Sequence, residues 1–411
     1  MSSPLKFLVL AQYFPPDMGG ASARVANVVK GLSSKGCEVK VVAAFPHYPL
    51  GNVQKGYRHK ALAIEEFRYA KVTRVWIPAL SHSSISNRVI LHMCFVVSSL
   101  FALPFIGDFD VVWAANPNLF CFYSALIYGF AKQKPIIRNV DDLWPEVFFE
   151  LRIVRSKFMK RFLDFLAKLS YIVPSAITPI SDGYKRRIIE EYHISPEKIH
   201  VIEVGVDSAN PRASDNNEKG QFVVMYSGVL GVGYDFETVL KTAGFLSQYD
   251  DLVFLIRGVG ELASTLEQMI RKFQLKNVVL DTDFLPKKKL SALLRRADVF
   301  LLPMSSAGSV NDGIPAKVFE YQAYGKPIIC ASGGEPSRYV KAIGCGLAVK
   351  PGDAYGLARA VVKLYRNRKL ASDLGWKGLK HVSENFTAER IGERMYEVIT
   401  YVKDKQRRAH Q

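Results

Sequence analysis

Short apolar runs alternate with amphipathic segments along the whole chain. The first series of strand-like runs lies at 6–16, 38–46, 110–117 and 135–142. The second series lies at 221–230, 251–260, 277–286, 297–304, 326–334 and 346–353. Continuous runs of Val, Ile and Leu are typical of buried parallel strands, and helices between such strands are typical of doubly wound sheets. The pattern therefore predicts an α/β fold with two Rossmann-like doubly wound domains that face a central cleft.

The segment 203–221 separates the two series. It is polar, contains a proline and lacks hydrophobic periodicity, as expected of a linker. We predict an N-terminal domain over 1–205, a C-terminal domain over 206–386, and a helix over 387–405 that returns to the N-terminal domain. Doubly wound sheets bind ligands beyond the carboxyl ends of their strands, so we expect the site in those loops and in the cleft between the domains.

The chain is strongly basic. It has 55 Lys and Arg against 38 Asp and Glu, a formal net charge of +17. This charge favours an anionic partner (nucleic acid, anionic lipid or a phosphorylated substrate) unless it reflects a generally basic proteome. The five cysteines are scattered through apolar stretches without the spacing of a metal site, so we expect reduced core residues of a cytosolic protein. The first apolar run is too short for a signal peptide and is interpreted as a strand.

Two uncharged runs, 89–107 and 111–131, are long enough to cross a bilayer. The second is better divided into a strand, an exit loop and a helix from Asn118. The first is interpreted as a buried or membrane-contacting helix. Segment 151–173 predicts a basic amphipathic helix with apolar residues at helical spacing, which is typical of a membrane-surface element or of an ordinary surface helix. Its residues are Arg152, Arg155, Lys157, Lys160, Arg161 and Lys168, with Val154, Phe158, Phe162 and Phe165.

The segment 311–335, NDGIPAKVFEYQAYGKPIICASGGE, combines an acid, a lysine and a glutamate at the start of one helix. We predict that this helix begins near Pro315 and ends near Gly325. Its first N–H groups and Lys317 would attract an anion. Glu320, three residues further on, could accept the two hydroxyls of a ribose, and Asp312 could meet a sugar hydroxyl. The alternative is a capped surface helix with a Lys–Glu pair.

Other loops after strands carry further candidates. Gly19 and Gly20 would let backbone N–H groups approach a phosphate or a sugar, or would only form a tight turn. Arg24, one turn later, would face either the cleft or solvent. Asp281 and Asp283 in the DTD sequence invite a metal-site interpretation, which we reject because they end a strand. His47 is interpreted as a loop residue rather than an acceptor contact.

Several linked motifs resemble glycosyltransferase family 4, whose members are retaining enzymes of the GT-B fold. D-GIPAKVFEYQAYGKPII is similar to the acid-x7-acid signature, with Asp312 and Glu320 as the two acids. PPDMGGASARVANVVKGLSSKG resembles the first glycine loop and helix. NVDDLWPE resembles a segment of the bacterial and archaeal surface-polysaccharide branch, which includes fucosaminyl- and N-acetylhexosaminyltransferases. EVGVD and LPKKKLSALLRRADVFLLP resemble the family's linker and a helix and strand of its second domain.

The resemblance implies roles for single residues. Glu320 would hold the ribose of a nucleotide-sugar, and Asp312 would approach the donor sugar. The family's usual basic residue after the first strand of the second domain is missing from YSGVLGVGYDFE, so Arg257 and Lys317 are our candidates for neutralising the diphosphate. Asp141 stands where many members have a histidine. Either Asp141 or Asp142 would orient the acceptor or accept its proton, or would cap the following helix.

We therefore expect a retaining glycosyltransferase that needs no metal or other cofactor. It would move a hexose or N-acetylhexosamine from a nucleotide-sugar, which we expect to be uridine-linked, to a surface glycan or a polyprenyl-linked glycan. The C-terminal domain would bind the donor through Gly228, Asn311, Gly313 and Glu320, and Gly19 and Gly20 of the N-terminal domain would be donor-binding residues as well. The N-terminal domain would bind the acceptor at an anionic membrane surface on the cytoplasmic side. A nucleotide-sugar epimerase and a basic nucleic-acid-binding protein are the alternatives, but no recognition module for nucleic acid is visible.

Overall fold

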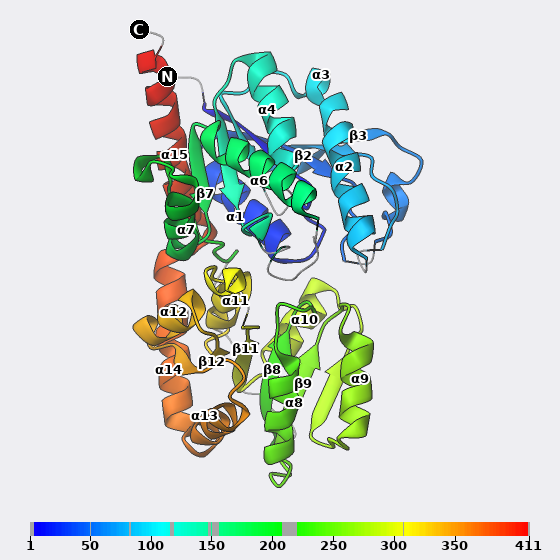
Figure 1. The fold of residues 1–411 in the computed structure, drawn as a ribbon, viewed down its shortest axis with the longest axis vertical. Coiled ribbons are helices and arrows are strands. Elements are labelled where there is room, and N and C mark those ends of the chain that lie inside the picture. The colour runs from blue at the N-terminus through cyan, green and yellow to red at the C-terminus, as the bar shows by residue number, and fades with distance from the viewer. Residues whose placement is uncertain are drawn as a thin grey trace. The chain divides into compact units, whose positions relative to one another are not determined.

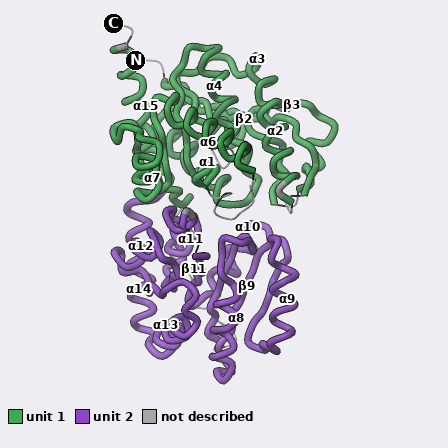
Figure 2. Tube along the Cα trace, in the orientation of Figure 1, with its two compact units in different colours: residues 1–207, 388–411 green, residues 208–387 purple. Residues whose placement is uncertain are grey.

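The computed structural model describes residues 4–49, 51–81, 84–115, 119–146, 149, 156–207, 220–306 and 308–409. The chain forms two compact units (Figure 2). Unit 1 consists of residues 1–207 and 388–411, and unit 2 consists of residues 208–387. Arg152, Val154 and Arg155 of the predicted basic helix, Asn118, and most of the predicted linker lie outside the described residues.

The sheet of unit 1 has seven strands in the order β3-β4-β2-β1-β5-β6-β7. All neighbours pair in parallel except β3 and β4, which are antiparallel. The strands are β1 (Lys6–Ala11), β2 (Glu38–Ala44), β3 (Leu62–Phe67), β4 (Ala70–Val75), β5 (Val111–Ala114), β6 (Ile136–Val140) and β7 (Ala176–Pro179). The helices are α1 (Gly20–Ser34), α2 (Ile85–Phe101), α3 (Leu103–Ile106), α4 (Cys121–Lys132), α6 (Lys157–Ile172), α7 (Asp182–Tyr192) and α15 (Ala388–Ala409). Short 3-10 turns lie at Lys55–Tyr57 and Pro196–Lys198.

One face of this sheet is closed by α2 and α4 (Figure 1). Leu91 and Phe95 of α2 and Phe122 of α4 pack on the alternate apolar residues of β1, β2 and β5. The uncharged run 89–107 therefore forms most of α2 and the short α3, with one side in the core. Among the described residues, no helix combines the length and the apolar character needed to cross a bilayer.

The C-terminal helix α15 completes unit 1 by packing along α1. Gly31 of α1 lies against the first turn of α15 and Gly392: a methyl group on Gly31 would lie 2.0 Å from the carbonyl oxygen of Ala388 and 2.7 Å from Cα of Gly392. Ion pairs lie beside this contact, from Lys30 to Glu389 and from Lys35 to Glu393. Small residues on both helices thus let the two backbones come into contact.

Unit 2 has a six-stranded, fully parallel sheet in the order β10-β9-β8-β11-β12-β13. The strands are β8 (Phe222–Ser227), β9 (Leu252–Arg257), β10 (Val278–Asp281), β11 (Val299–Pro303), β12 (Ile328–Ala331) and β13 (Gly346–Val349). The helices are α8 (Phe236–Phe245), α9 (Ala263–Lys272), α10 (Lys287–Leu294), α11 (Ala316–Ala323), α12 (Glu335–Ile343), α13 (Ala354–Arg366) and α14 (Arg368–Asn385), with a 3-10 turn at Ser309–Asn311. Two Rossmann-like sheets, one parallel except for the β3–β4 pair and one fully parallel, confirm the predicted α/β fold class.

The strand order of unit 2 reverses between β8 and β11, which are neighbours in the sheet but not in the chain. Doubly wound sheets bind ligands beyond the carboxyl ends of the strands at such a reversal. The loops that follow β8 and β11 are therefore the first place to look for a site in this unit.

Candidate functional site

The turn that follows β8 is built around Gly228. This residue has φ 153°, a conformation that favours glycine. The loop that follows β9 contacts this turn closely: a methyl group on Gly258 would lie 1.7 Å from the carbonyl oxygen of Gly228. The Gly228 amide donates to the carbonyl of Arg257 at 3.0 Å. The backbones of the loops after β8 and β9 are thus in direct contact and hydrogen-bonded to each other.

Lys317 of α11 lies directly over this turn. Its ammonium donates to the Tyr234 hydroxyl at 3.0 Å and lies 4.6 Å from the centre of the Tyr234 ring and 5.4 Å from that of Tyr226. A methyl group on Gly228 would be only 2.0 Å from Cε of Lys317. The turn after β8 has no basic residue of its own, and Lys317 brings a cation to it from another element. Two aromatic faces stabilise that cation without neutralising it.

Tyr321 fixes α11 against the end of β8. Its hydroxyl accepts a hydrogen bond from the Ser227 amide and donates one to the Ser227 carbonyl, both at 3.1 Å. Its ring is stacked on Phe300 of β11, with centroids 4.0 Å apart. Sequence reasoning missed Tyr321, Tyr226 and Tyr234, whose only signal was the presence of aromatic residues beside the candidate motifs.

Glu320 shares α11 with Lys317 and is partly buried. Burial raises the pKa of its carboxyl, while the charges of Lys317 and Lys287 act in the opposite direction. The helix itself begins one residue later than predicted: Pro315 is the N-cap and Ala316 the first helical residue. Gly325 has φ 66° just beyond the helix end, where a left-handed residue is common.

Asn311 holds the loop between β11 and α11 in place. Its amide donates to the Ser305 carbonyl at 2.8 Å, and its side-chain oxygen accepts from the Ser332 hydroxyl at 2.6 Å. Asn311 is buried, and these bonds connect the loops after β11 and β12. Asp312 follows it and is partly exposed, whereas Gly313 is buried. The side chain of Asn311 therefore positions the loop that carries Asp312.

Arg257 is engaged inside unit 2. Its Nε lies 3.0 Å from Oδ2 of Asp281, and its Nη2 donates to the Asp283 carbonyl at 2.6 Å. Only 6% of the residue is exposed, so the guanidinium joins the ends of β9 and β10. The DTD sequence thus has a structural explanation in the Asp281–Arg257 pair. Among the described residues there is no group of three or more His, Cys, Asp or Glu that could hold a metal ion.

In unit 1, the glycine turn before α1 is fixed by the loop after β2. Gly19 has φ 138°, and a methyl group there would lie 3.1 Å from the ring of Tyr48; Gly20 is the first residue of α1. The buried Asp17 accepts hydrogen bonds from the amides of His47 (2.8 Å) and Tyr48 (2.9 Å). Burial raises the pKa of Asp17 to about 7, although these two bonds oppose the shift.

His47 also belongs to this packed loop. Its Nδ1 lies 2.9 Å from the Phe45 carbonyl oxygen, and its ring is stacked on Tyr13 with centroids 5.4 Å apart. It is 3% exposed. The structure therefore gives His47 a packing role, which agrees with its interpretation as a loop residue.

The expectation for Arg24 was wrong, because its side chain faces neither a cleft nor solvent. Arg24 is completely buried beside the ends of β6 and β7. Its Nη2 donates to Asn139 Oδ1 at 2.6 Å, and its Nε lies 2.9 Å from Asp141 Oδ1. Asn139, which sequence reasoning missed, also donates to Asp141 at 2.8 Å. The side-chain oxygens of Asn139 and Asp141 offset the free-energy cost of burying the Arg24 guanidinium.

The two adjacent acids after β6 have different surroundings. Asp141 points toward Arg24, and burial raises the pKa of its carboxyl while the Arg24 charge opposes that shift. Asp142 is exposed. Of the pair, Asp142 is therefore the more exposed residue, and Asp141 is paired with the buried Arg24.

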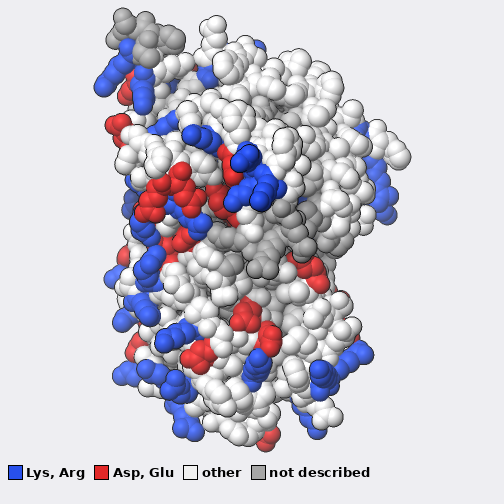
Figure 3. Space-filling model, in the orientation of Figure 1, with Lys and Arg blue, Asp and Glu red and all other residues white. Residues whose placement is uncertain are grey.

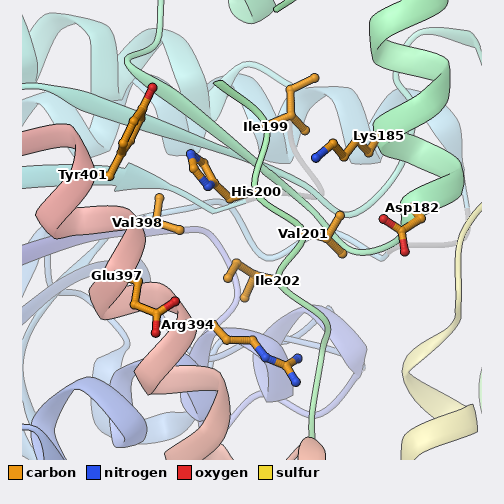
Figure 4. Close-up of a pocket in the computed structure, with 10 residues that line it drawn as sticks. All are labelled: Asp182, Lys185, Ile199, His200, Val201, Ile202, Arg394, Glu397, Val398 and Tyr401. Carbon is orange, nitrogen blue, oxygen red and sulfur yellow. The ribbon is translucent and has the colours of Figure 1, made fainter. Parts of the chain in front are cut away.

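A separate pocket of about 490 Å³ lies elsewhere on unit 1 (Figure 4). It is bounded by α7, segment 199–202 and α15, and the ring of His200 lies 5.0 Å from that of Tyr401. Arg394 at its edge forms an ion pair with Glu203. None of the candidate residues from the sequence lines this pocket.

Comparison with known proteins gives two family matches. The family described as "Glycosyltransferase Family 4" matches residues 18–210, and the family described as "Glycosyl transferases group 1" matches residues 207–381. The chain is 22% identical to the MMP alpha-(1->4)-mannosyltransferase of Mycolicibacterium hassiacum, over 94% of this chain and 96% of that protein. It is 26% identical to the amylovoran biosynthesis glycosyltransferase AmsK of Erwinia amylovora, over 46% and 47% of the two chains.

Solved structures share the fold. The sucrose-phosphate synthase of Thermosynechococcus elongatus is similar with a TM-score of 0.75 and 16% identity, over 99% of this chain and all of that one (100%). Anabaena HepE in complex with UDP is similar with a TM-score of 0.67 and 16% identity, over 97% and 100% of the two chains. The two family matches overlap at 207–210 and together cover residues 18–381, and the chain therefore belongs to the glycosyltransferases of family 4, with the GT-B fold.

Proposed function

We propose that this glycosyltransferase moves a hexose or N-acetylhexosamine from a UDP-sugar to a surface glycan or a lipid-linked glycan, with retention of anomeric configuration. The observation that carries the proposal is Lys317, whose ammonium is held over the glycine turn after β8. In transfer, the bond between the sugar and the diphosphate breaks, and UDP leaves with the bonding electrons. A fixed cation beside that diphosphate stabilises its developing charge.

The remaining roles follow from the same unit. The start of α11 offers backbone N–H groups to a phosphate, and Glu320 on the same helix would accept the hydroxyls of the ribose. Asp312, in the loop held by Asn311, would contact the donor sugar, and Gly228 and Gly313 would leave room for the nucleotide. Arg257 is a positioning residue in this proposal, because Asp281 and Asp283 occupy its guanidinium.

Unit 1 would bind the acceptor. The exposed Asp142 would orient the acceptor hydroxyl or accept its proton, and Arg24 and Asp141 would hold that loop. Gly19 and Gly20 would let the start of α1 approach the donor sugar. Retention rests on family membership, and the reaction as proposed needs no metal or other cofactor.

Two similarities support the choice of donor and acceptor. HepE has been solved with UDP and with UDP-glucose, which favours a uridine nucleotide. AmsK is named for amylovoran biosynthesis, which favours a glycan acceptor. Nucleic acid is not a partner in this proposal.

The test begins with thermal stability in the presence of UDP, GDP and ADP. A ligand that binds only the folded state raises the melting temperature. We expect UDP to stabilise the wild type and to have little effect on Glu320→Ala, whereas the exposed Glu237→Ala should respond like the wild type. Stabilisation by GDP or ADP alone would contradict the proposed donor, and release of free sugar epimer without an acceptor would indicate the epimerase alternative.

A further inference from the structure

Helix α6 exposes its aromatic side chains. Phe158 is 79% exposed, Phe162 48% and Phe165 58%. These residues are spaced by four and three positions, so they form one stripe along the helix. The side of α6 that packs on unit 1 consists instead of Ala167, Ser170 and Tyr171. A surface helix normally buries its apolar stripe, and here the stripe faces outward.

Neighbouring helices expose apolar side chains in the same way. Phe101 of α2 is 72% exposed and Phe130 of α4 is 74% exposed. Hydrogen bonds connect the three helices: Tyr128 of α4 donates to the Ser99 carbonyl of α2 at 2.6 Å, and Tyr123 of α4 donates to the Leu166 carbonyl of α6 at 2.8 Å. Figure 1 shows α2, α4 and α6 in one layer of unit 1. We call these outward residues the aromatic surface: Phe101, Phe105, Phe130, Phe158, Phe162 and Phe165.

Basic residues flank the part of the aromatic surface that α6 forms. At 100° per residue, Lys157, Arg161 and Lys168 lie along one edge of the α6 stripe. The only acid among the residues of α6 is Asp164. Figure 3 shows a group of Lys and Arg at this place, beside a wide area without charged residues. An apolar stripe bordered by cations is the pattern of a helix that lies in the interface of an anionic membrane.

We propose that the aromatic surface binds the headgroup region of a bilayer that contains acidic phospholipid, with α6 lying in the plane of that region. The phenylalanines would enter the boundary between headgroups and acyl chains, and the three cations would contact lipid phosphates. A second copy of the chain fits less well, because an isologous contact would bring the same cations of both copies together. This interaction goes beyond the transferase reaction and does not depend on its donor.

The probe is sedimentation of the full chain with vesicles, either of phosphatidylcholine alone or of phosphatidylcholine mixed with phosphatidylglycerol. We expect binding to the mixed vesicles that weakens as salt is added. Lys157→Gln/Arg161→Gln/Lys168→Gln should bind these vesicles on the order of 100-fold more weakly, since each cation near an acidic surface contributes about fivefold. Phe158→Ser/Phe162→Ser/Phe165→Ser should lose binding to the mixed vesicles although it keeps all three cations.

The matched control removes three exposed cations from unit 2, as Lys272→Gln/Lys288→Gln/Lys289→Gln, and should bind like the wild type. Equal losses in the two charge variants would mean that net charge, and not this surface, attracts lipid, and would overturn the proposal. A wild type that stays in solution with mixed vesicles at low salt would also overturn it. Light scattering completes the test: a wild-type dimer that becomes a monomer in the phenylalanine variant, without vesicle binding, would assign the surface to a second copy. The UDP-induced rise in melting temperature, measured on the same samples, reports separately on the proposed donor.

Discussion

Lys317 occupies the space that any side chain on Gly228 would need. The hypothetical methyl group would lie 2.0 Å from Cε and 2.4 Å from Nζ of the lysine. One glycine at the end of β8 thus permits a cation from α11 to lie at the point where the strand order of unit 2 reverses. The two residues are 89 positions apart in the chain (317 − 228) and act as one feature of the site.

Gly228→Ala should therefore weaken UDP binding by displacing Lys317, and it should also strain the backbone at φ 153°. Lys317→Ala should lower UDP affinity by about 10- to 100-fold, the loss expected for a hydrogen bond to a charged group. Calorimetric titration with UDP measures both. Gly233→Ala is the control in the same loop, because its nearest neighbour, Val310, is 4.0 Å away. If Lys317→Ala bound UDP with wild-type affinity, Lys317 would not be part of the UDP site.

Tyr321→Phe tests whether the Tyr321 hydroxyl affects UDP binding by holding α11 against β8, without contacting UDP itself. Loss of the hydroxyl leaves the buried Ser227 amide without this partner, at a cost of about 1–3 kcal/mol in the free energy of unfolding. UDP affinity should fall as well, because α11 is no longer fixed to β8. Urea denaturation and UDP titration of the same variant test this prediction. A stable variant with normal UDP binding would show that the hydroxyl does not hold α11.

The Arg24–Asp141 pair should be strongly coupled. Arg24→Met leaves the Asp141 carboxylate buried beside Asn139, and we expect a loss of about 3–5 kcal/mol in the free energy of unfolding. Arg24→Met/Asp141→Leu removes both charges and should be more stable than Arg24→Met. Urea denaturation of the two single variants and the double variant gives the coupling energy. Additive losses would mean that the pair is not an energetic unit.

Asp17 should make stability depend on pH. The pKa of its carboxyl group is about 7 in the folded protein, compared with an ordinary value of 3.8. Between these values the folded protein holds a proton that the unfolded chain has lost. Raising the pH from about 4 to about 7 therefore lowers the free energy of unfolding, by up to about 4 kcal/mol for this group.

Asp17→Asn tests this dependence, since the amide oxygen can still accept from His47 and Tyr48. The difference in unfolding free energy between wild type and variant should change by the stated amount across that pH range. A constant difference from pH 4 to pH 7 would contradict the raised pKa.

Gly392→Ala should loosen the contact of α15 with α1. The hypothetical methyl group would lie 2.3 Å from the carbonyl carbon of Gly31, and both partners are backbone, so helices must shift. We expect a loss of roughly 1–3 kcal/mol in the free energy of unfolding. Gly56→Ala is the control, because no atom lies within 4 Å of its added methyl group. If the two variants had equal free energies of unfolding, α15 would accommodate the added methyl group without a loss of stability.

The fold was accessible from the sequence because continuous apolar runs mark buried parallel strands, whatever their partners. Local spacing also predicted that Lys317 and Glu320 share one helix, as they do in α11. It failed for Arg24, because α1 carries an arginine on its inner face and only the tertiary structure reveals the oxygens of Asn139 and Asp141 around it. The sequence could not show that Asp281 would pair with Arg257, since that ion pair depends on the register of β9 with β10.

The sequence also could not show that the apolar stripe of α6 faces solvent. Periodicity places apolar residues on one side of a helix, but it does not show which side packs against the rest of the protein.

The glycine contact between α1 and α15 has a consequence for biosynthesis. Unit 1 includes α15, yet the ribosome makes all of unit 2 between the first part of unit 1 and this helix. Domains commonly fold in the order in which they are synthesised. Here the order is inverted: unit 2 can finish first, while the nascent unit 1 exposes the α1 face that α15 will cover.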